Sequence, residues 1–82
     1  MPCFAFQIST EDVENVLRSY SLRVTNTKGQ SFEHMAEELI DELDHERIEH
    51  AALSASTDLD EQTTAAYEEI KKLLVELGVL DF

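Results

Sequence analysis

Glutamate and histidine side chains recur at close spacing in one stretch of the chain, between residues 42 and 50. Positions three or four apart lie on the same side of a helix, so these carboxylates and imidazoles are able to meet. The five residues are Glu42, His45, Glu46, Glu49 and His50. A carboxylate followed three residues later by a histidine is a unit that four-helix di-iron sites use twice. Here the unit occurs once, so only a dimer would supply the second copy. A metal-binding helical protein is therefore kept as the second alternative. The main prediction includes no metal or other cofactor.

A second set of acidic residues has the spacing of a calcium-binding loop. Asp58, Asp60 and Glu69 occupy the first, third and twelfth positions of such a loop. The sixth position must turn sharply and needs glycine, but it is Thr63 in this chain. The sequence therefore predicts no calcium site, and Asp58 is explained as the cap of a helix.

The residues needed for other common catalytic sites are missing from the sequence. With two glycines, Gly29 and Gly78, the chain has no phosphate-binding loop and no dinucleotide fingerprint. No serine lies in a nucleophile-elbow pattern. The single cysteine, Cys3, has neither a local basic partner to activate it nor a second cysteine for an internal disulfide. The protein is therefore predicted not to be an enzyme, and its cysteine content agrees with a reducing, cytoplasmic location.

Negative charge dominates the composition. The chain of 82 residues contains 18 Asp and Glu but 6 Lys and Arg, which gives a formal net charge of −12. Residues 1–30 contain equal numbers of acids and bases, so all of the excess lies in residues 31–82. This charge argues against direct binding to nucleic acid or to an anionic membrane surface. No apolar run approaches the roughly 18 residues that would indicate a membrane-spanning helix.

The acidic residues are densest in a helix predicted over residues 31–50. Several stand four positions apart, as in Glu33/Glu37, and such like-charge pairs each cost a helix about 0.2–0.5 kcal/mol. We expect seven of these acids to form a partner-binding surface: Glu33, Glu37, Glu38, Asp41, Glu42, Glu46 and Glu49. The sequence thus favours a non-enzymatic interaction protein that presents these carboxylates to a basic protein. A sharper version is an inhibitor that mimics the charge of nucleic acid.

A homo-oligomeric accessory or regulatory module is the first alternative. In this hypothesis the acidic residues serve solubility alone, and apolar residues make the contact between copies. The predicted contacts are an N-terminal strand and a shifted apolar stripe that contains Ile48, Ala51 and Ala52. A homodimer joined in this way is compatible with the sequence.

Two strands and a helix are predicted in the first 30 residues. Alternation with period two predicts a strand over Cys3–Ile8 and a second short strand over Ser21–Thr25. Between them, Ser9 is expected to cap a helix together with Asp12, three residues further on. Residues 26–30 have the composition of a turn.

A long helical segment is predicted after Ser31. Its apolar stripe follows helical spacing as far as Leu43 and then shifts by roughly a quarter turn. We expect a kink or break near Asp44, with that residue as the cap of a new short helix. One continuous helix that contacts two partners on two faces is the other interpretation.

The last helix is expected to follow a polar linker at residues 54–57. Asp58 and Glu61 form its predicted cap, and Gly78 is expected to end it in the left-handed conformation. The sequence therefore predicts one small, mainly helical domain over residues 1–82, with three or four helices and one or two short N-terminal strands. Its core is expected to contain ten apolar residues: Phe4, Phe6, Val13, Leu17, Phe32, Leu39, Leu43, Ile70, Leu73 and Leu77.

Overall fold

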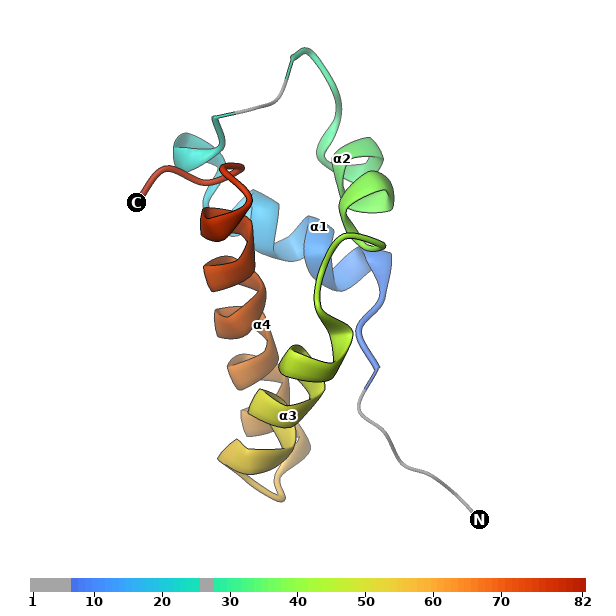
Figure 1. Cartoon of the computed structure of the whole chain (residues 1–82), viewed down its shortest axis with the longest axis vertical. Helices are drawn as coiled ribbons and strands as arrows, with labels where there is room; N and C mark the ends of the chain where they lie inside the picture. The colour runs from blue at the N-terminus through green and yellow to red at the C-terminus, as the bar shows by residue number, and fades with distance from the viewer. Residues whose placement is uncertain (1–6, 26–27) are drawn as a thin grey trace.

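Four α-helices and one short 3₁₀ helix make up the structure, a computed structural model that describes residues 7–25 and 28–82. In chain order they are α1 (Thr10–Ser19), the 3₁₀ helix η1 (Ser21–Arg23), α2 (Phe32–Leu39), α3 (His45–Ala55) and α4 (Leu59–Glu76). Figure 1 shows α4 as the longest element, with α3 lying beside it. No strand forms within the described residues, so the predicted mainly helical fold is confirmed and its strands are not.

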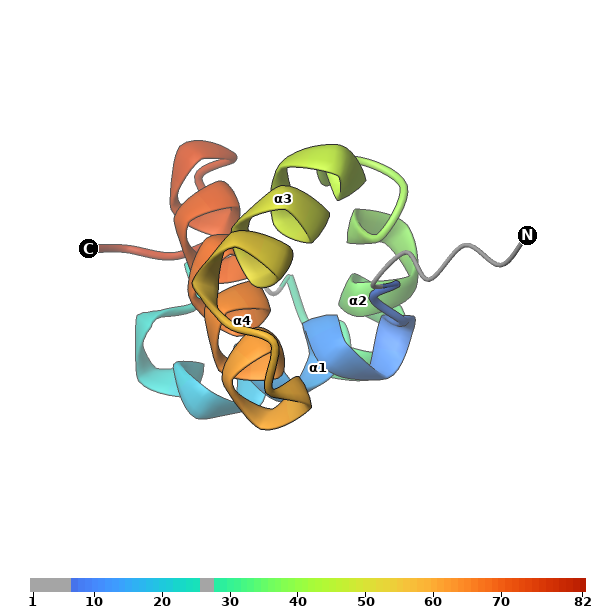
Figure 2. The same cartoon turned by 90° about the horizontal axis from the view of Figure 1, so that it is seen from below.

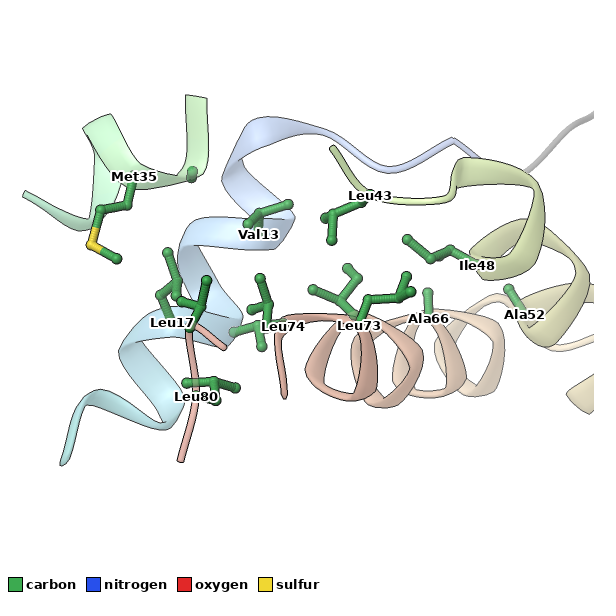
Figure 3. Close-up of a cluster of buried hydrophobic side chains, with 14 residues drawn as sticks. Val13, Leu17, Met35, Leu43, Ile48, Ala52, Ala66, Leu73, Leu74 and Leu80 are labelled. Atoms are coloured by element: carbon green, nitrogen blue, oxygen red, sulfur yellow. The ribbon is translucent and has the colours of Figure 1, made fainter. Parts of the chain in front are cut away.

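The helices pack in pairs around one hydrophobic core. The helix α1 packs against α2, and α3 packs against α4; α1 also contacts α4, which joins the two pairs (Figure 2). Every buried residue in the described part of the chain is apolar. The core, drawn in Figure 3, consists of Val13, Val16, Leu17, Met35, Ala36, Leu43, Ile48, Ala52, Ala66, Ile70, Leu73, Leu74, Val79 and Leu80.

Side-chain caps fix where the first three helices begin. At α1 the Ser9 hydroxyl accepts a hydrogen bond from the N–H of Asp12, and the Asp12 carboxylate accepts one from the N–H of Ser9 at 2.8 Å. This reciprocal arrangement is the predicted capping box. Ser31 and Asp44 begin α2 and α3 by accepting from the N–H three residues further on. Each cap satisfies a backbone donor that has no partner inside the helix.

The C-terminus of α4 ends in a tight turn around Gly78. The N–H of Val79 bonds to the carbonyl of Leu74 at 2.9 Å, and the N–H of Gly78 bonds to the carbonyl of Val75 at 3.0 Å. This pair of hydrogen bonds defines a Schellman motif, which requires a left-handed residue at its centre. Gly78 has φ of 81°, so the predicted helix end is confirmed.

Replacing Gly78 with alanine is expected to destabilise the protein by about 1 kcal/mol, because alanine is strained at positive φ. An added Cβ would meet no atom within 4 Å, so the loss should come from the backbone conformation alone. Gly78→Asn should lose less, since asparagine tolerates this conformation better. Urea denaturation followed by circular dichroism measures both variants. Equal stability of Gly78→Ala and the wild type would contradict the prediction.

The second predicted strand, Ser21–Thr25, does not form, and this segment instead contacts the C-terminal tail. The segment forms η1, and Val24 then makes an isolated antiparallel bridge with Leu80 of the tail. The strand prediction is wrong because the alternation of Leu22 and Val24 does not reflect burial on a shared face. Leu22 is 99% exposed, whereas Val24 packs against the core.

The first predicted strand, Cys3–Ile8, lies mostly outside the described residues, and so do the predicted core residues Phe4 and Phe6. Of its residues, Gln7 and Ile8 are described, and neither is in a strand. Ile8 is half-buried and packs against the core just before the cap of α1.

The predicted break near Asp44 is confirmed. The helix α2 ends at Leu39 and α3 begins at His45, so residues 40–44 connect two separate helices. The interpretation as one continuous helix over residues 31–50 is wrong. The shift of the apolar stripe has a direct cause, because α2 packs on α1 whereas α3 packs on α4.

The connection between α3 and α4 is shorter than predicted. The helix α3 continues to Ala55, which lies inside the linker predicted at residues 54–57. Asp58 caps α4, as expected, but its carboxylate accepts from the N–H of Asp60 at 3.0 Å rather than from that of Glu61. Asp58 is therefore the predicted cap residue, but its predicted pairing with Glu61 is wrong.

The core prediction is partly confirmed. Five of the predicted residues are buried: Val13, Leu17, Leu43, Ile70 and Leu73. Phe32 and Leu39 are half-buried at the edge of the core. Leu77, by contrast, is 44% exposed. The turn at Gly78 brings Val79 and Leu80 into the core, at the end of the stripe where Leu77 was expected.

Candidate functional site

The seven carboxylates predicted to bind a partner are distributed over two helices and the connection between them. We call them the acidic segment. Glu33, Glu37 and Glu38 lie on α2, Asp41 and Glu42 in the connection, and Glu46 and Glu49 on α3. Glu49 is half-buried, and the other six residues are exposed. The acidic segment is thus accessible at most of its positions.

The break between α2 and α3 reduces the repulsion expected along this segment. Glu33 and Glu37 both lie within α2 and keep their helical spacing of four residues. Glu42 also stands four positions from Glu38 and from Glu46, but it lies in the connection, so these are not pairs on the surface of one helix. The cost estimated for one continuous helix therefore applies to fewer pairs.

Arg47 is the one lysine or arginine between residues 29 and 70. Its guanidinium hydrogen-bonds the carboxylate of Glu76 through Nη1 at 3.2 Å and Nη2 at 3.0 Å. Its Nε donates to the carboxylate of Glu69, also on α4. Hydrogen bonds to Glu76 and then to Glu69 raise the pKa of Arg47, and desolvation opposes them without cancelling the rise. The positive charge of α3 is thus directed to α4 and not to the acidic segment.

Short-range contacts are made by Glu38 of the acidic segment and across the connection between α2 and α3. The carboxylate of Glu38 accepts from the amide of Gln30 at 3.4 Å and lies 3.3 Å from Nε2 of His34. Nε2 of His45 is 2.6 Å from the carbonyl oxygen of Ile40. This second contact spans the connection and bonds a carbonyl at the C-terminus of α2, where backbone acceptors lack a helical partner.

No group of three or more His, Asp or Glu side chains that could hold a metal is found within residues 7–25 and 28–82. The carboxylate–histidine unit predicted from Glu42 and His45 depends on a shared helix, but Glu42 precedes α3. The ring of His45 is engaged with a backbone carbonyl. The five residues singled out for metal binding are therefore not arranged as a ligand set.

A pocket of about 130 Å³ adjoins the acidic segment. It lies between α2 and the tail that follows α4, and its lining residues are Gln30, Met35, Glu38, Leu39, Glu42 and Val79. Two of these residues belong to the acidic segment, and three are apolar. No spacing in the sequence indicates this pocket, because Val79 joins the other lining residues only when the tail folds back.

A separate polar network connects α1 to α4. The hydroxyl of Tyr67 donates to Oδ1 of Asp12 at 3.1 Å and accepts from the amide of Asn15 at 3.3 Å. The hydrogen bond from the amide of Asn15 lowers the pKa of Tyr67. Partial burial and the hydrogen bond to Asp12 raise this pKa and together outweigh the effect of Asn15, so the pKa lies above its ordinary value. The same Asp12 carboxylate that caps α1 therefore also fastens this helix to α4.

An alkaline titration should detect this network. In a Tyr20→Phe variant, Tyr67 is the only remaining tyrosine, and its tyrosinate absorbance should appear at higher pH in the folded chain than in urea. Because the pKa is raised on folding, this contribution to stability is complete below the unfolded pKa and is lost as pH rises through the folded pKa. Adding Asp12→Asn should lower the folded midpoint. Identical midpoints in folded and unfolded chains would contradict the assignment.

Comparisons with family models, with curated proteins and with solved structures each give no match. In the part of the chain that the structure describes, none of the helices combines the length and the apolar character needed to cross a membrane.

Proposed function

We propose that this protein is a non-enzymatic interaction module whose acidic segment docks against a basic protein. The pairing of Arg47 with α4 carries the proposal. The one cation within this part of the chain is bound to Glu69 and Glu76, so it does not neutralise the exposed carboxylates of α2 and the connection. A surface charged in this way attracts a basic partner and speeds its association.

A mimic of nucleic-acid charge is the sharper form of the proposal. Glu33 and Glu37 are separated by one turn of α2, a rise of about 6 Å along the helix. Regularly spaced negative charge is also what a phosphate backbone presents to a basic protein. The partner in this form is a protein that ordinarily binds DNA or RNA, and duplex DNA or RNA should compete with the acidic protein for it.

The test compares two triple variants that change the net charge equally. Glu33→Gln, Glu37→Gln and Glu46→Gln remove three of the seven charges of the acidic segment, whereas Glu11→Gln, Glu61→Gln and Glu68→Gln remove three charges from exposed positions of α1 and α4. A basic protein captured from the native cell by the wild type should then be purified and its binding measured. Its association with the first variant should be on the order of tenfold slower, and association with the second should change much less.

Salt dependence provides the second readout of the same experiment. Binding through exposed charges weakens as ionic strength rises, since salt screens them beyond about 8–10 Å. Affinity for the wild type should therefore fall between low and high salt. Equal losses in the two triple variants, or affinity that is independent of salt, would overturn the proposal.

The oligomeric alternative loses one of its two predicted contacts, the shifted apolar stripe, whereas its N-terminal strand lies mostly outside the described residues. Ile48 and Ala52 are fully buried within the chain, and Figure 3 shows Ile48 beside Ala66 and Leu73 of α4. Ala51 is half-buried. The shifted stripe therefore packs α3 onto α4 and does not form an exposed surface for a second copy.

A further inference from the structure

The pocket between α2 and the C-terminal tail combines an apolar floor with an acidic rim. We call it the acid-rimmed pocket. Met35 and Val79 are buried and Leu39 is half-buried, so these three residues supply apolar surface. The carboxylates of Glu38 and Glu42 lie at exposed positions of the lining. These two kinds of surface meet within one cavity.

Hydrogen-bond acceptors dominate the polar part of the pocket. The lining contains two carboxylates and the amide of Gln30 and has no lysine, arginine or histidine. The amide nitrogen of Gln30 donates to Glu38 at 3.4 Å, which leaves its amide oxygen as an acceptor. Two ionised carboxylates offer several acceptor positions, and these are matched by a cationic donor.

The size of the pocket limits what it can accept. Its volume is about 130 Å³, similar to the apolar cavities of about 150 Å³ that bind benzene in other proteins. It therefore suits one long side chain and not a helix or a large ligand. Lysine and arginine both lay their methylene groups along apolar surface while the charged end stays among polar groups.

Arginine fits this combination better than lysine. Its planar guanidinium carries five N–H donors and can bond to more than one carboxylate, and it is less strongly hydrated than an ammonium group. Glu38 and Glu42 both line the pocket, and a planar guanidinium brings more N–H donors to two carboxylates than an ammonium group does. We propose that the acid-rimmed pocket anchors one arginine side chain of a basic partner, an inference that rests on the proposed function.

The experiment uses a blocked tripeptide, acetyl-Gly-Arg-Gly-amide, titrated into the wild-type protein. Methyl NMR follows Met35, Leu39 and Val79, whose signals should shift together and saturate. Matched peptides carry lysine or citrulline in place of arginine; citrulline keeps the shape of arginine but has no charge. The citrulline peptide should bind at least about tenfold more weakly than the arginine peptide. The lysine peptide should also bind more weakly than the arginine peptide.

Two double variants with the same loss of charge locate the site. Glu38→Gln with Glu42→Gln should weaken binding of the arginine peptide about tenfold. Glu33→Gln with Glu37→Gln removes two charges from α2 outside the pocket lining and should have a much smaller effect. Equal effects of the two variants, or no saturable shift at the three methyl-bearing residues, would overturn the anchor site. A lysine peptide that binds equally well would overturn the choice of arginine.

The outcome remains separable from that of the proposed function. If the pocket titration fails while the purified partner still distinguishes the two triple variants, only the anchor site is lost. If the partner does not distinguish those triple variants, the proposed function fails, whether or not the tripeptide enters the pocket.

Discussion

Replacing Leu74 with alanine is expected to destabilise the domain by about 2–5 kcal/mol. Leu74 is 0% exposed in the centre of the core, where α4 approaches α1 (Figure 3). The change removes apolar surface from the core and leaves a cavity that its neighbours fill only in part. Because a chain of 82 residues has a total stability of about 4–12 kcal/mol, this loss removes a large fraction of the free energy of unfolding. Chemical denaturation followed by circular dichroism measures the loss.

Two other leucines provide matched controls for this substitution. Leu22 is 99% exposed and Leu77 is 44% exposed. Leu22→Ala should change stability by less than about 0.5 kcal/mol, and Leu77→Ala should give an intermediate loss. A loss for Leu77→Ala as large as that for Leu74→Ala would show that the core extends to Leu77 after all.

An Ile48→Asp substitution should unfold the protein. Ile48 is fully buried where α3 packs on α4, and no buried residue in the described ranges is polar. An aspartate at this position would lack a partner for its charge, and burying an unpaired charge costs several kcal/mol. The loss should therefore rival or exceed the total stability of about 4–12 kcal/mol. Circular dichroism should show helix content well below that of the wild type.

Leu53→Asp, on the same helix, makes the same kind of change at a position that is 47% exposed. This variant should remain folded, with a modest loss of stability. A fully folded, stable Ile48→Asp monomer would mean that Ile48 is not required inside the domain and would contradict the packing of α3 on α4.

Local chemistry made the helices predictable from the sequence. Ser9 with Asp12 marked the start of α1, and Asp44 marked the start of α3, because capping depends on residues only two or three positions apart. Gly78 marked the end of α4 for a similar reason, since the left-handed conformation favours glycine. The shifted apolar stripe also located the break before α3 correctly.

Features that depend on distant parts of the chain were missed or wrong. Alternation suggested a strand at Ser21–Thr25, but the geometry of that segment depends on a tail more than 50 residues later. The placement of Leu77 outside the core has the same origin, because local periodicity does not register that Val79 turns inward. Helical spacing identifies a face of one helix and not the neighbour against which it packs.

The candidate site shows the same division. The charge of the acidic segment could be read from the sequence, since six of its seven residues are at exposed positions as expected for carboxylates. The pairing of Arg47 with Glu69 and Glu76 could not, because it depends on how α3 lies on α4. The acid-rimmed pocket needs Gln30 and Val79 together, and no spacing rule relates them.

The hydrogen bond between Thr25 and the C-terminal tail has a consequence for folding kinetics. Thr25 donates through its hydroxyl to the carbonyl of Gly78, 53 residues away, whereas Arg47 and Glu69 in the α3–α4 pair are 22 residues apart. Contacts between distant residues require more loop-closure entropy before they form. We therefore expect the α3–α4 hairpin to form early and the tail to join residues 23–25 late. Weakening the tail contact, as in Thr25→Val, should then accelerate unfolding and leave the folding rate nearly unchanged.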